Sequence, residues 1–348
     1  MIHEKRFSQV TRIDTIMADA DARGWGPIAA LAQLTAVLFQ GRRRSFPDGR
    51  VGRARKLWDL RPRPRGNRDR VLLALLHSPA HIVHLRRSAA FREGYGTVVA
   101  WIIDSFRDDY PLRRAEYAGI DLICIIRRDE LAHYRRHLGD RVMALNWGAD
   151  VLGAGSDAGE RPVDLLRIGR QPEAWQDDSA TERVAAEHGL RFAGRPPLVP
   201  DLLENQRRVM AAYAATKFVI AHTNLASTDA YTHRVKEYIT GRWTDALACG
   251  ATVAGIQPKN DDSFRRLFWP GATLDFDRID LRHNMQALAE AVAAWTPGQA
   301  RRNHLMALER LDWRHGLKRI AETVSAGSPA LDADLAEIAR RTQTAPAC

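Results

Sequence analysis

Two series of short apolar runs, each followed by a helix-like stretch, constrain the fold of this chain most strongly. The first series comprises residues 71–76, 98–103, 122–126 and 142–145, and the second comprises residues 163–168, 191–193, 218–221 and 252–256. Strands that alternate with helices in this way predict parallel βαβ units. We therefore predict an α/β fold with two successive doubly wound, Rossmann-like domains.

A change in composition marks the predicted boundary between these domains. Residues 153–162, GAGSDAGERP, are small, polar and turn-forming, which predicts a linker. The N-terminal domain is then residues 71–152, and the C-terminal domain, including helices over 280–294 and 298–324, is residues 163–325. Residues 326–348 are predicted to form a short helix and a mobile tail.

The first seventy residues do not follow the alternating pattern. Residues 28–39 have apolar positions all around a helix, which predicts a buried or interfacial helix. Residues 41–70 hold twelve Arg and Lys against three Asp, which is most of the formal net charge of +10. Residues 1–70 are thus predicted to be a helix plus a basic arm that packs on or flanks the N-terminal domain. The arm's candidate partners are an anionic membrane surface, a polyanionic acceptor or nucleic acid, and a solvated loop without a partner is the alternative.

Composition sets the remaining limits. A chain of 348 residues, 45% hydrophobic and 27% charged, is typical of a globular protein with two domains. No run of about eighteen apolar residues occurs, and the first ten residues lack the apolar core of a signal peptide. We expect a cytoplasmic protein, with peripheral attachment to the inner face of the membrane left open. The cysteines, Cys124, Cys249 and Cys348, lie far apart, so neither a disulfide framework nor a zinc site is predicted.

The most informative local motif begins at Glu237 and reads EYITGRWTDALACG. If Thr240, Gly241 and Arg242 open a helix, its first N–H groups and its dipole favour a diphosphate, and Arg242 adds a forked cationic contact. Asp245, one turn later, could accept hydrogen bonds from a ribose diol, and Glu237 could reach the sugar or the leaving phosphate. An ordinary turn and helix of a doubly wound sheet is the alternative interpretation.

This motif resembles the GT-B-fold glycosyltransferases, in the group that includes the spore-maturation glycosyltransferase-like proteins (glycosyl transferases group 1). The shared signature is a turn ending in Arg, an aromatic residue, an acid, a small-residue helix with Ala-Cys-Gly, and a strand. In the wider retaining GT-B enzymes, two Glu occupy the positions matched by Glu237 and Asp245, and the second usually holds the ribose. Gly169 and Arg170 match the place where these enzymes open the donor domain with a Gly turn facing the phosphates. The resemblance covers residues 71–324 and implies two Rossmann-like domains facing a central cleft, with a C-terminal helix crossing back.

An acid at the end of an apolar run is the candidate catalytic group of the first domain. Asp104 follows VVAWII, and the segment WIID resembles a strand-end Trp-x-x-Asp of the acceptor-side domain. As a base that deprotonates an acceptor hydroxyl, Asp104 would make the enzyme inverting. If Asp104 instead caps a helix or binds the acceptor, the two acids of the signature favour a retaining enzyme with no separate base. Both mechanisms stay open.

No metal is predicted. His77, His81 and His84 are spaced four and then three residues apart, as on one helix face, but Ser78 and Pro79 start a helix after His77. No further carboxylate or cysteine completes a ligand set. GT-B enzymes generally need no metal for the donor phosphates, and no cofactor is expected.

The resemblance implies a hexosyltransferase-type glycosyltransferase. It would move a sugar from a nucleotide-sugar donor to a hydroxyl of a glycan, glycolipid or small-molecule acceptor. The alternative from another class is a non-catalytic GT-B-like protein that binds nucleic acid or an anionic polymer through the basic arm. A GT-B epimerase or phosphorylase would share the same donor fold.

Overall fold

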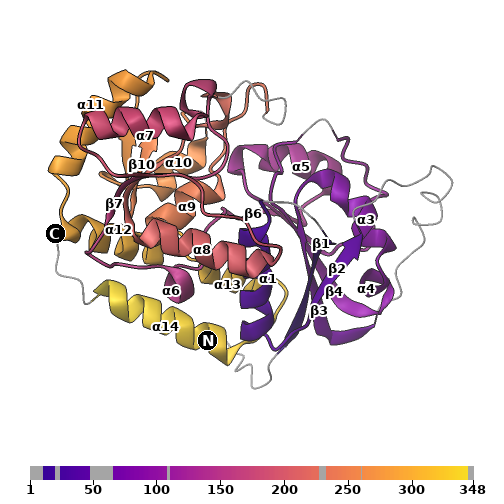
Figure 1. The fold of residues 1–348 in the computed structure, drawn as a ribbon. Coiled ribbons are helices and arrows are strands. Elements are labelled where there is room, and N and C mark those ends of the chain that lie inside the picture. Colours follow the sequence, from indigo (N-terminus) through magenta and orange to yellow (C-terminus); the bar gives the residue numbers. More distant parts are fainter. Residues whose placement is uncertain are drawn as a thin grey trace. The chain divides into compact units, whose positions relative to one another are not determined.

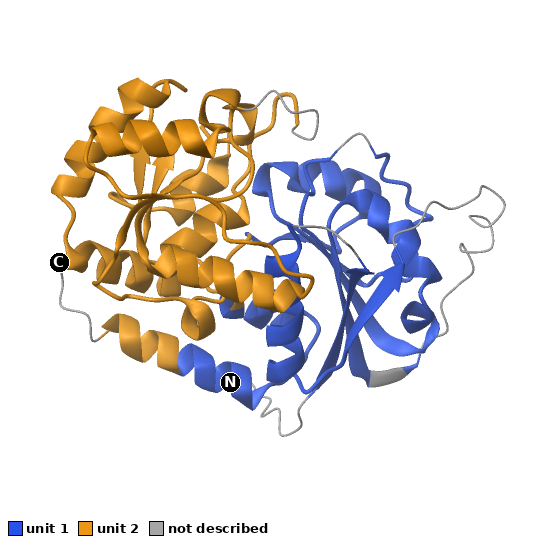
Figure 2. Cartoon of the chain, viewed as in Figure 1, with its two compact units in different colours: residues 1–146, 314–336 blue, residues 147–313, 337–348 orange. Residues whose placement is uncertain are grey.

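The computed structural model describes residues 11–19, 24–47, 66–107, 110–226, 233–259 and 261–343. The chain divides into two compact units, coloured separately in Figure 2. Unit 1 comprises residues 1–146 and 314–336, and unit 2 comprises residues 147–313 and 337–348. The chain therefore returns to unit 1 after completing most of unit 2.

Unit 1 is built on a six-stranded parallel sheet with the order β2-β1-β3-β4-β5-β6 (Figure 1). Its strands are β1 (Arg12–Asp19), β2 (Arg43–Pro47), β3 (Asn67–Leu76), β4 (Tyr95–Ile102), β5 (Leu122–Ile125) and β6 (Val142–Ala144). Its helices are α1 (Gly26–Leu38), η1 (Pro79–His81), α3 (Ile82–Arg87), α4 (Ala89–Arg92), η2 (Arg128–Glu130), α5 (Leu131–Leu138) and most of α13 (Trp313–Thr323). Every residue from 71 to 76 in β3 is buried, as expected of a central parallel strand covered on both faces.

Unit 2 is built on a five-stranded parallel sheet with the order β11-β10-β9-β7-β8. Its strands are β7 (Val163–Arg167), β8 (Phe192–Ala193), β9 (Thr216–Ile220), β10 (Thr252–Gly255) and β11 (Thr273–Asp275). Its helices are α6 (Val151–Ala154), η3 (Glu173–Trp175), α7 (Asp178–Glu187), α8 (Leu202–Ala214), η4 (Asn224–Ala226), α9 (Gly241–Ala248), α10 (Asp262–Leu267), α11 (Leu281–Ala293) and α12 (Pro297–Arg310). Helices α7 and α11 lie on one side of the sheet and α8, α9 and α12 on the other (Figure 1).

Both sheets share one topology. In each, the first strand lies between the second and the third, so the chain reverses its direction of winding between the first and third strands. Ligands of open α/β sheets bind outside the carboxyl ends of the strands at this switch point. The switch point lies between β1 and β3 in unit 1 and between β7 and β9 in unit 2. The predicted α/β class with two Rossmann-like domains is confirmed.

The predicted boundaries of the first domain were wrong, because β1 and β2 belong to its sheet. Strand β1 was missed because two polar residues, Asp14 and Thr15, are fully buried inside it. Asp14 accepts hydrogen bonds from Tyr95 Oη at 2.6 Å and from Arg12 Nε at 2.8 Å. Strand β2 has a single buried residue, Phe46, and forms the edge of the sheet, so its sequence lacks an apolar run. The predicted helix over 28–39 is confirmed as α1.

The predicted linker over 153–162 lies inside unit 2, and the division between the units falls between Asn146 and Trp147. Arg161 explains the difference. Its guanidinium is buried and donates to the backbone oxygens of Thr216 at 2.6 Å and of Cys249 at 2.7 Å. The turn-forming composition of the segment predicted a hinge, but this one side chain ties it to the sheet and to the end of α9.

The predicted mobile tail over 326–348 is largely the helix α14 (Pro329–Gln343). Ser328 caps it, since its Oγ accepts from the backbone N of Leu331 at 3.1 Å. Leu331 and Ile338 are buried, which explains why the segment is ordered. Residues 344–348 lie outside the described residues.

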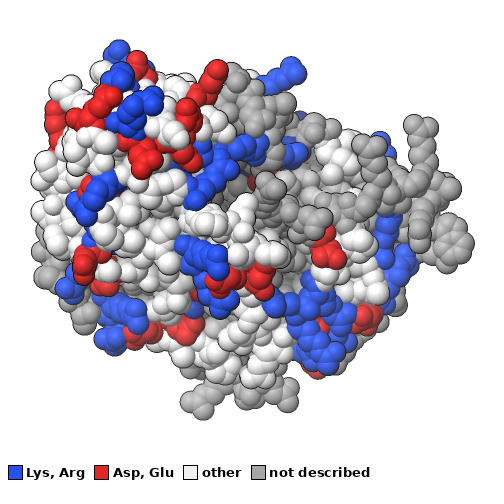
Figure 3. All heavy atoms as spheres, in the orientation of Figure 1, with Lys and Arg blue, Asp and Glu red and all other residues white. Residues whose placement is uncertain are grey.

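The predicted basic arm can be followed only in part. Residues 48–65 lie outside the described residues, and the ends of the segment enter β2 and β3. On the face drawn in Figure 3, Lys and Arg side chains are interspersed with Asp and Glu side chains. Among the described residues, no helix is long and apolar enough to cross a membrane.

Candidate functional site

The switch point of unit 2 opens with a glycine turn after β7. Gly169 has φ +75°, a conformation that favours glycine. A Cβ at this position would lie 3.1 Å from Arg242 Cδ, so the glycine lets the arginine pack against the turn. Arg242 donates from its guanidinium to the backbone oxygen of Arg170 at 2.6 Å. The structure thus brings Arg242 to Gly169 and Arg170, although Arg242 follows Arg170 by 72 residues in the sequence.

Helix α9 begins where the motif predicts. Thr240 is the residue before its first turn and has extended backbone angles, and the helix runs from Gly241 to Ala248. The side chain of Thr240 does not cap the helix, and its Oγ1 is buried without a hydrogen-bond partner among the described residues. The first N–H groups of a helix and its dipole attract anions. Arg242 therefore joins this helix end to the Gly169 turn, and both elements suit a phosphate group.

Glu237 is held at the carboxyl end of β9. It is buried, and its Oε1 accepts from Thr223 Oγ1 at 2.6 Å. Asn224 fixes the flanking backbone, since it donates to Lys236 O at 2.9 Å and accepts from Tyr238 N at 3.2 Å. The segment that carries the predicted sugar-contacting acid is therefore bound to the loop that follows β9.

His222 lies in the same loop, two residues after β9, and is only 2% exposed. Its Nδ1 accepts from the backbone N of Ile256 at 3.2 Å, while its Nε2 has no hydrogen-bond partner among the described residues. Burial, and then the positive charge of Arg242, lower the pKa of His222 to about 3. The imidazole is therefore neutral and carries an N–H donor at Nε2. Its place at a strand end was visible in the sequence, but its contact with Ile256 depends on the fold.

Asp245 occupies a different environment from the one predicted. It is 2% exposed, and its Oδ2 accepts from Gln206 Nε2 of α8 at 2.9 Å. Its Oδ1 has no partner among the described residues. Burial raises the pKa of Asp245 to about 7, against the opposing effect of the Gln206 hydrogen bond. In this structure Asp245, the residue predicted to bind the ribose, faces the interior of unit 2.

Asp104 lies in unit 1, two residues beyond β4. Its carboxylate oxygen Oδ2 is 2.8 Å from His77 Nε2, and its backbone N donates to His77 O at 2.7 Å. The sequence places both residues at strand ends, but their contact depends on the pairing of β3 with β4.

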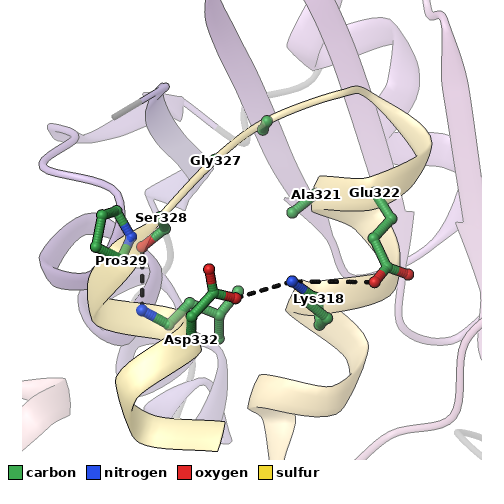
Figure 4. Close-up of a pocket in the computed structure, with 9 residues that line it drawn as sticks. Lys318, Ala321, Glu322, Gly327, Ser328, Pro329 and Asp332 are labelled. Atoms are coloured by element: carbon green, nitrogen blue, oxygen red, sulfur yellow. Dashed lines mark hydrogen bonds and ion pairs between the residues drawn. The ribbon is translucent and has the colours of Figure 1, made fainter. Parts of the chain in front are cut away.

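Two other features of the described residues bear on ligand binding. No group of three or more His, Cys, Asp or Glu in this part of the chain is arranged to hold a metal ion. A pocket between α13 and α14 is lined by Lys318, Glu322, Ser328 and Asp332, among others (Figure 4). Lys318 lies 2.8 Å from Asp332 and 4.0 Å from Glu322, so the one cation among the described residues of this pocket is already paired with carboxylates.

Comparison with known proteins finds a family match in the second half of the chain. Residues 159–326 match the protein family described as Glycosyl transferase-like. This region is similar to glycosyltransferases. It contains the Gly169 turn and all of α9, so the resemblance predicted from the sequence is confirmed for this part of the chain. No curated protein matches the chain significantly.

Solved structures with distant likeness include the following three. TarM is 9% identical, with a TM-score of 0.43; the match covers 75% of this chain and 55% of TarM, so the chain spans about half the length of that protein. Sucrose-phosphate synthase from Thermosynechococcus elongatus is 11% identical, with a TM-score of 0.49, over 90% of this chain and 98% of that one. AviGT4, a glycosyltransferase involved in avilamycin A biosynthesis, is 15% identical, with a TM-score of 0.48, over 92% and 98%.

Proposed function

We propose that this protein is a glycosyltransferase of the hexosyl type. It would transfer a sugar from a nucleotide-sugar to a hydroxyl of a glycan, glycolipid or small-molecule acceptor. The observation that carries the proposal is the junction at the unit 2 switch point. There Arg242, on the first turn of α9, packs on Gly169 and bonds to Arg170. A cation, a helix amino end and a glycine turn are the elements that bind a diphosphate without a metal.

The remaining predicted residues have roles in the same proposal. Thr240 and Gly241 would supply a hydroxyl and backbone N–H groups to the phosphates, and Arg170 a second cation. Glu237, fixed by Thr223, would contact the sugar or the leaving phosphate. Asp245 would bind the ribose after exchanging its Gln206 contact, and Asp104 would belong to the proton-transfer step in unit 1.

A thermal-shift screen against UDP, GDP, CMP, dTDP and their sugars tests the proposal. A ligand that binds only the folded state raises the melting temperature, because it increases the free energy of unfolding by about 2.7 kcal/mol at a hundredfold excess over Kd. We expect a shift with one nucleotide, unchanged by EDTA. Arg242→Ala should weaken binding by about 10-fold to 100-fold, since a charged hydrogen bond contributes roughly 1.5–3 kcal/mol.

Arg282→Ala is the matched control for this experiment. Arg282 is an exposed arginine of α11 in the same unit, and it pairs with Glu187 at 2.7 Å. Its loss should leave the shift intact. If nucleotide raises the melting temperature equally in wild type and Arg242→Ala, the junction does not bind the donor. If none of the nucleotides raises the melting temperature of the wild type, the transferase function is refuted.

A further inference from the structure

The motif that begins at Glu237 does not include a buried histidine at the switch point of unit 2. His222 follows β9, the central strand of the sheet, by two residues, at the edge where open α/β sheets bind their ligands. Two aromatic rings contact its imidazole, with the centroid of Trp175 at 5.5 Å and that of Phe276 at 5.8 Å. These two rings also stack on each other. The imidazole is therefore held in one orientation by packing.

A hydrogen bond from Ile256 determines which nitrogen of this imidazole carries the proton. The backbone N of Ile256 lies 3.2 Å from His222 Nδ1, and a backbone N–H can only donate. Nδ1 must therefore accept, so the proton of the neutral imidazole is on Nε2. A second proton on the ring would break this bond, and burial, followed by the positive charge of Arg242, also lowers the pKa of His222. His222 is thus a neutral N–H donor and not a cation.

His304, on α12 of the same unit, has the opposite arrangement. Its Nδ1 lies 2.8 Å from the backbone oxygen of Ala248, the last residue of α9, and a carbonyl oxygen can only accept. The proton of His304 is therefore on Nδ1 and is used within the fold. Both imidazoles are buried, but the donor nitrogen of His222, Nε2, has no acceptor in the part of the chain that the structure describes.

A buried donor without an acceptor indicates the kind of group that it can bind. Nearly all buried N–H groups in proteins have an acceptor, because leaving one without a partner costs free energy. Since Nδ1 is committed to Ile256, the side chain of His222 can only donate, and its best complement is an atom that only accepts, such as a phosphate oxygen. The charge of Arg242, on the first turn of α9, acts on this imidazole, so His222 is close enough to share an anion with that guanidinium.

We propose that His222 binds the donor diphosphate by donating a hydrogen bond from Nε2 to a phosphate oxygen beside Arg242. The inference rests on the proposed function and adds a residue to its donor site. A neutral donor suits this position, because a second cation would repel Arg242, whereas an imidazole N–H adds a hydrogen bond without this repulsion. Nε2 is covered in this structure, so a phosphate oxygen reaches it only after the side chains around it move.

Calorimetric titration with UDP, GDP and dTDP tests this contact, and the nucleotide that binds the wild type most tightly is then used for the variants. In His222→Asn, the amide oxygen can still accept from Ile256 N at the place of Nδ1, but the Nε2 donor is lost. This variant should bind the nucleoside diphosphate about 10-fold to 100-fold more weakly, which is the usual effect of losing a hydrogen bond to a charged group.

His304→Asn is the matched control. Its amide N–H can still donate to Ala248 O, and this histidine lies at the opposite end of α9 from Arg242. We expect its affinity for the nucleotide to stay within about threefold of wild type. Urea unfolding of both variants measures how much each ring contributes to stability alone, and a merely structural role of His222 would change this stability without changing the affinity of the folded protein.

Nitrogen-15 NMR of the wild-type protein tests the same contact without any substitution. The signals of His222 can be assigned through its contacts with the rings of Trp175 and Phe276. We expect the proton of His222 on Nε2 and that of His304 on Nδ1. Saturation with the nucleoside diphosphate should shift the Nε2 signal of His222 and leave the signals of His304 unchanged.

The outcomes separate this inference from the proposed function. Three results, each with nucleotide binding in the wild type, would overturn the inference alone: a His222→Asn affinity within about threefold of wild type, an unshifted Nε2 signal at saturation, or a proton on Nδ1 of His222. Absence of nucleotide binding by the wild type would refute the proposed function, and the inference with it.

Discussion

At the switch point of unit 2, between β7 and β9, the chain presents backbone groups and cations. Gly169, Arg242 and the amino end of α9 meet there, and the nearby imidazole of His222 is kept neutral by burial. At the switch point of unit 1, between β1 and β3, the chain presents a histidine and a carboxylate instead. The same strand order thus presents different side chains in the two units, because the loops after the strands carry different residues.

The comparison extends to two buried aspartates, which makes it testable by pH. Burial raises the pKa of Asp245 in unit 2 to about 7. Burial would also raise the pKa of Asp14 in unit 1, but hydrogen bonds from Tyr95, Arg12 and the backbone of Arg42 outweigh it and hold the value at about 2. The two carboxyls therefore have opposite effects on stability.

The largest expected effects come from replacing these two residues. The ionised carboxylate of Asp245 destabilises the fold, because it is buried. The free energy of unfolding of Asp245→Asn should therefore increase relative to that of the wild type as the pH rises from 4 to 7, by about 4 kcal/mol at most. Asp14 is stabilising above the pKa of the unfolded chain, so Asp14→Asn should lose roughly 2 kcal/mol above pH 4 and recover as the pH falls toward 2. Urea unfolding over a pH series measures both. Slopes of the same sign in the two variants would contradict the comparison.

A second pair of variants removes one hydroxyl from the carboxyl edge of each sheet. Thr223 Oγ1 donates to Glu237 at 2.6 Å in unit 2, and Ser105 Oγ donates to Glu130 at 2.8 Å in unit 1. Thr223→Val and Ser105→Ala should each lower the free energy of unfolding by roughly 1.5–3 kcal/mol, the contribution of a hydrogen bond to a charged group. Calorimetric titration with a nucleotide-sugar should show weakened binding in Thr223→Val only. Equal weakening in both variants would mean that Glu237 has no specific role.

A third pair separates backbone strain from ligand binding within unit 2. Gly169 has φ +75° and Gly189 has φ +72°, but a Cβ at Gly189 would meet no atom within 4 Å. Replacing either by Ala should destabilise the fold by about 1–2 kcal/mol, the difference between left-handed and ordinary backbone for an L-residue. Gly169→Ala should also weaken nucleotide binding several-fold, because its methyl group displaces Arg242. Thermal shifts with and without nucleotide measure both effects, and normal affinity in Gly169→Ala would show that Arg242 needs no close contact with the turn.

The smallest effect on donor binding is expected from the basic segment. Neutralising the seven Arg and Lys between residues 48 and 65 should change nucleotide affinity less than twofold at 0.15 M salt, because none of them belongs to the proposed donor site. The same change should reduce binding to vesicles that contain anionic lipid. Salt-sensitive binding of RNA or DNA that disappears in this variant, without nucleotide binding by the wild type, would favour the non-catalytic alternative.

The sequence predicted those strands and helices whose pattern lies within one short segment. The alternating runs predicted strands β3 to β6 of the first sheet and β7 to β10 of the second. The motif from Glu237 predicted a helix opened by Thr240 to Arg242, and α9 begins there, at Gly241. Strand β1 was not predicted, because its buried Asp14 is stabilised by a hydrogen bond from Tyr95, a residue eighty-one positions away. The contact of Asp245 with Gln206, and that of His77 with Asp104, also joins residues distant in the sequence. Such contacts depend on which strands and helices become neighbours in the fold, and a local sequence pattern does not predict those neighbours.

The most direct test of the account is a calorimetric comparison of nucleoside monophosphate and diphosphate binding in wild type and Arg242→Ala. The junction of Arg242 with Gly169 and Arg170 should make the diphosphate bind more tightly than the monophosphate in the wild type. In Arg242→Ala this advantage should shrink by about tenfold or more, since a charged hydrogen bond contributes roughly 1.5–3 kcal/mol. An unchanged preference for the diphosphate in the variant would contradict the assignment of the donor phosphates to the switch point of unit 2.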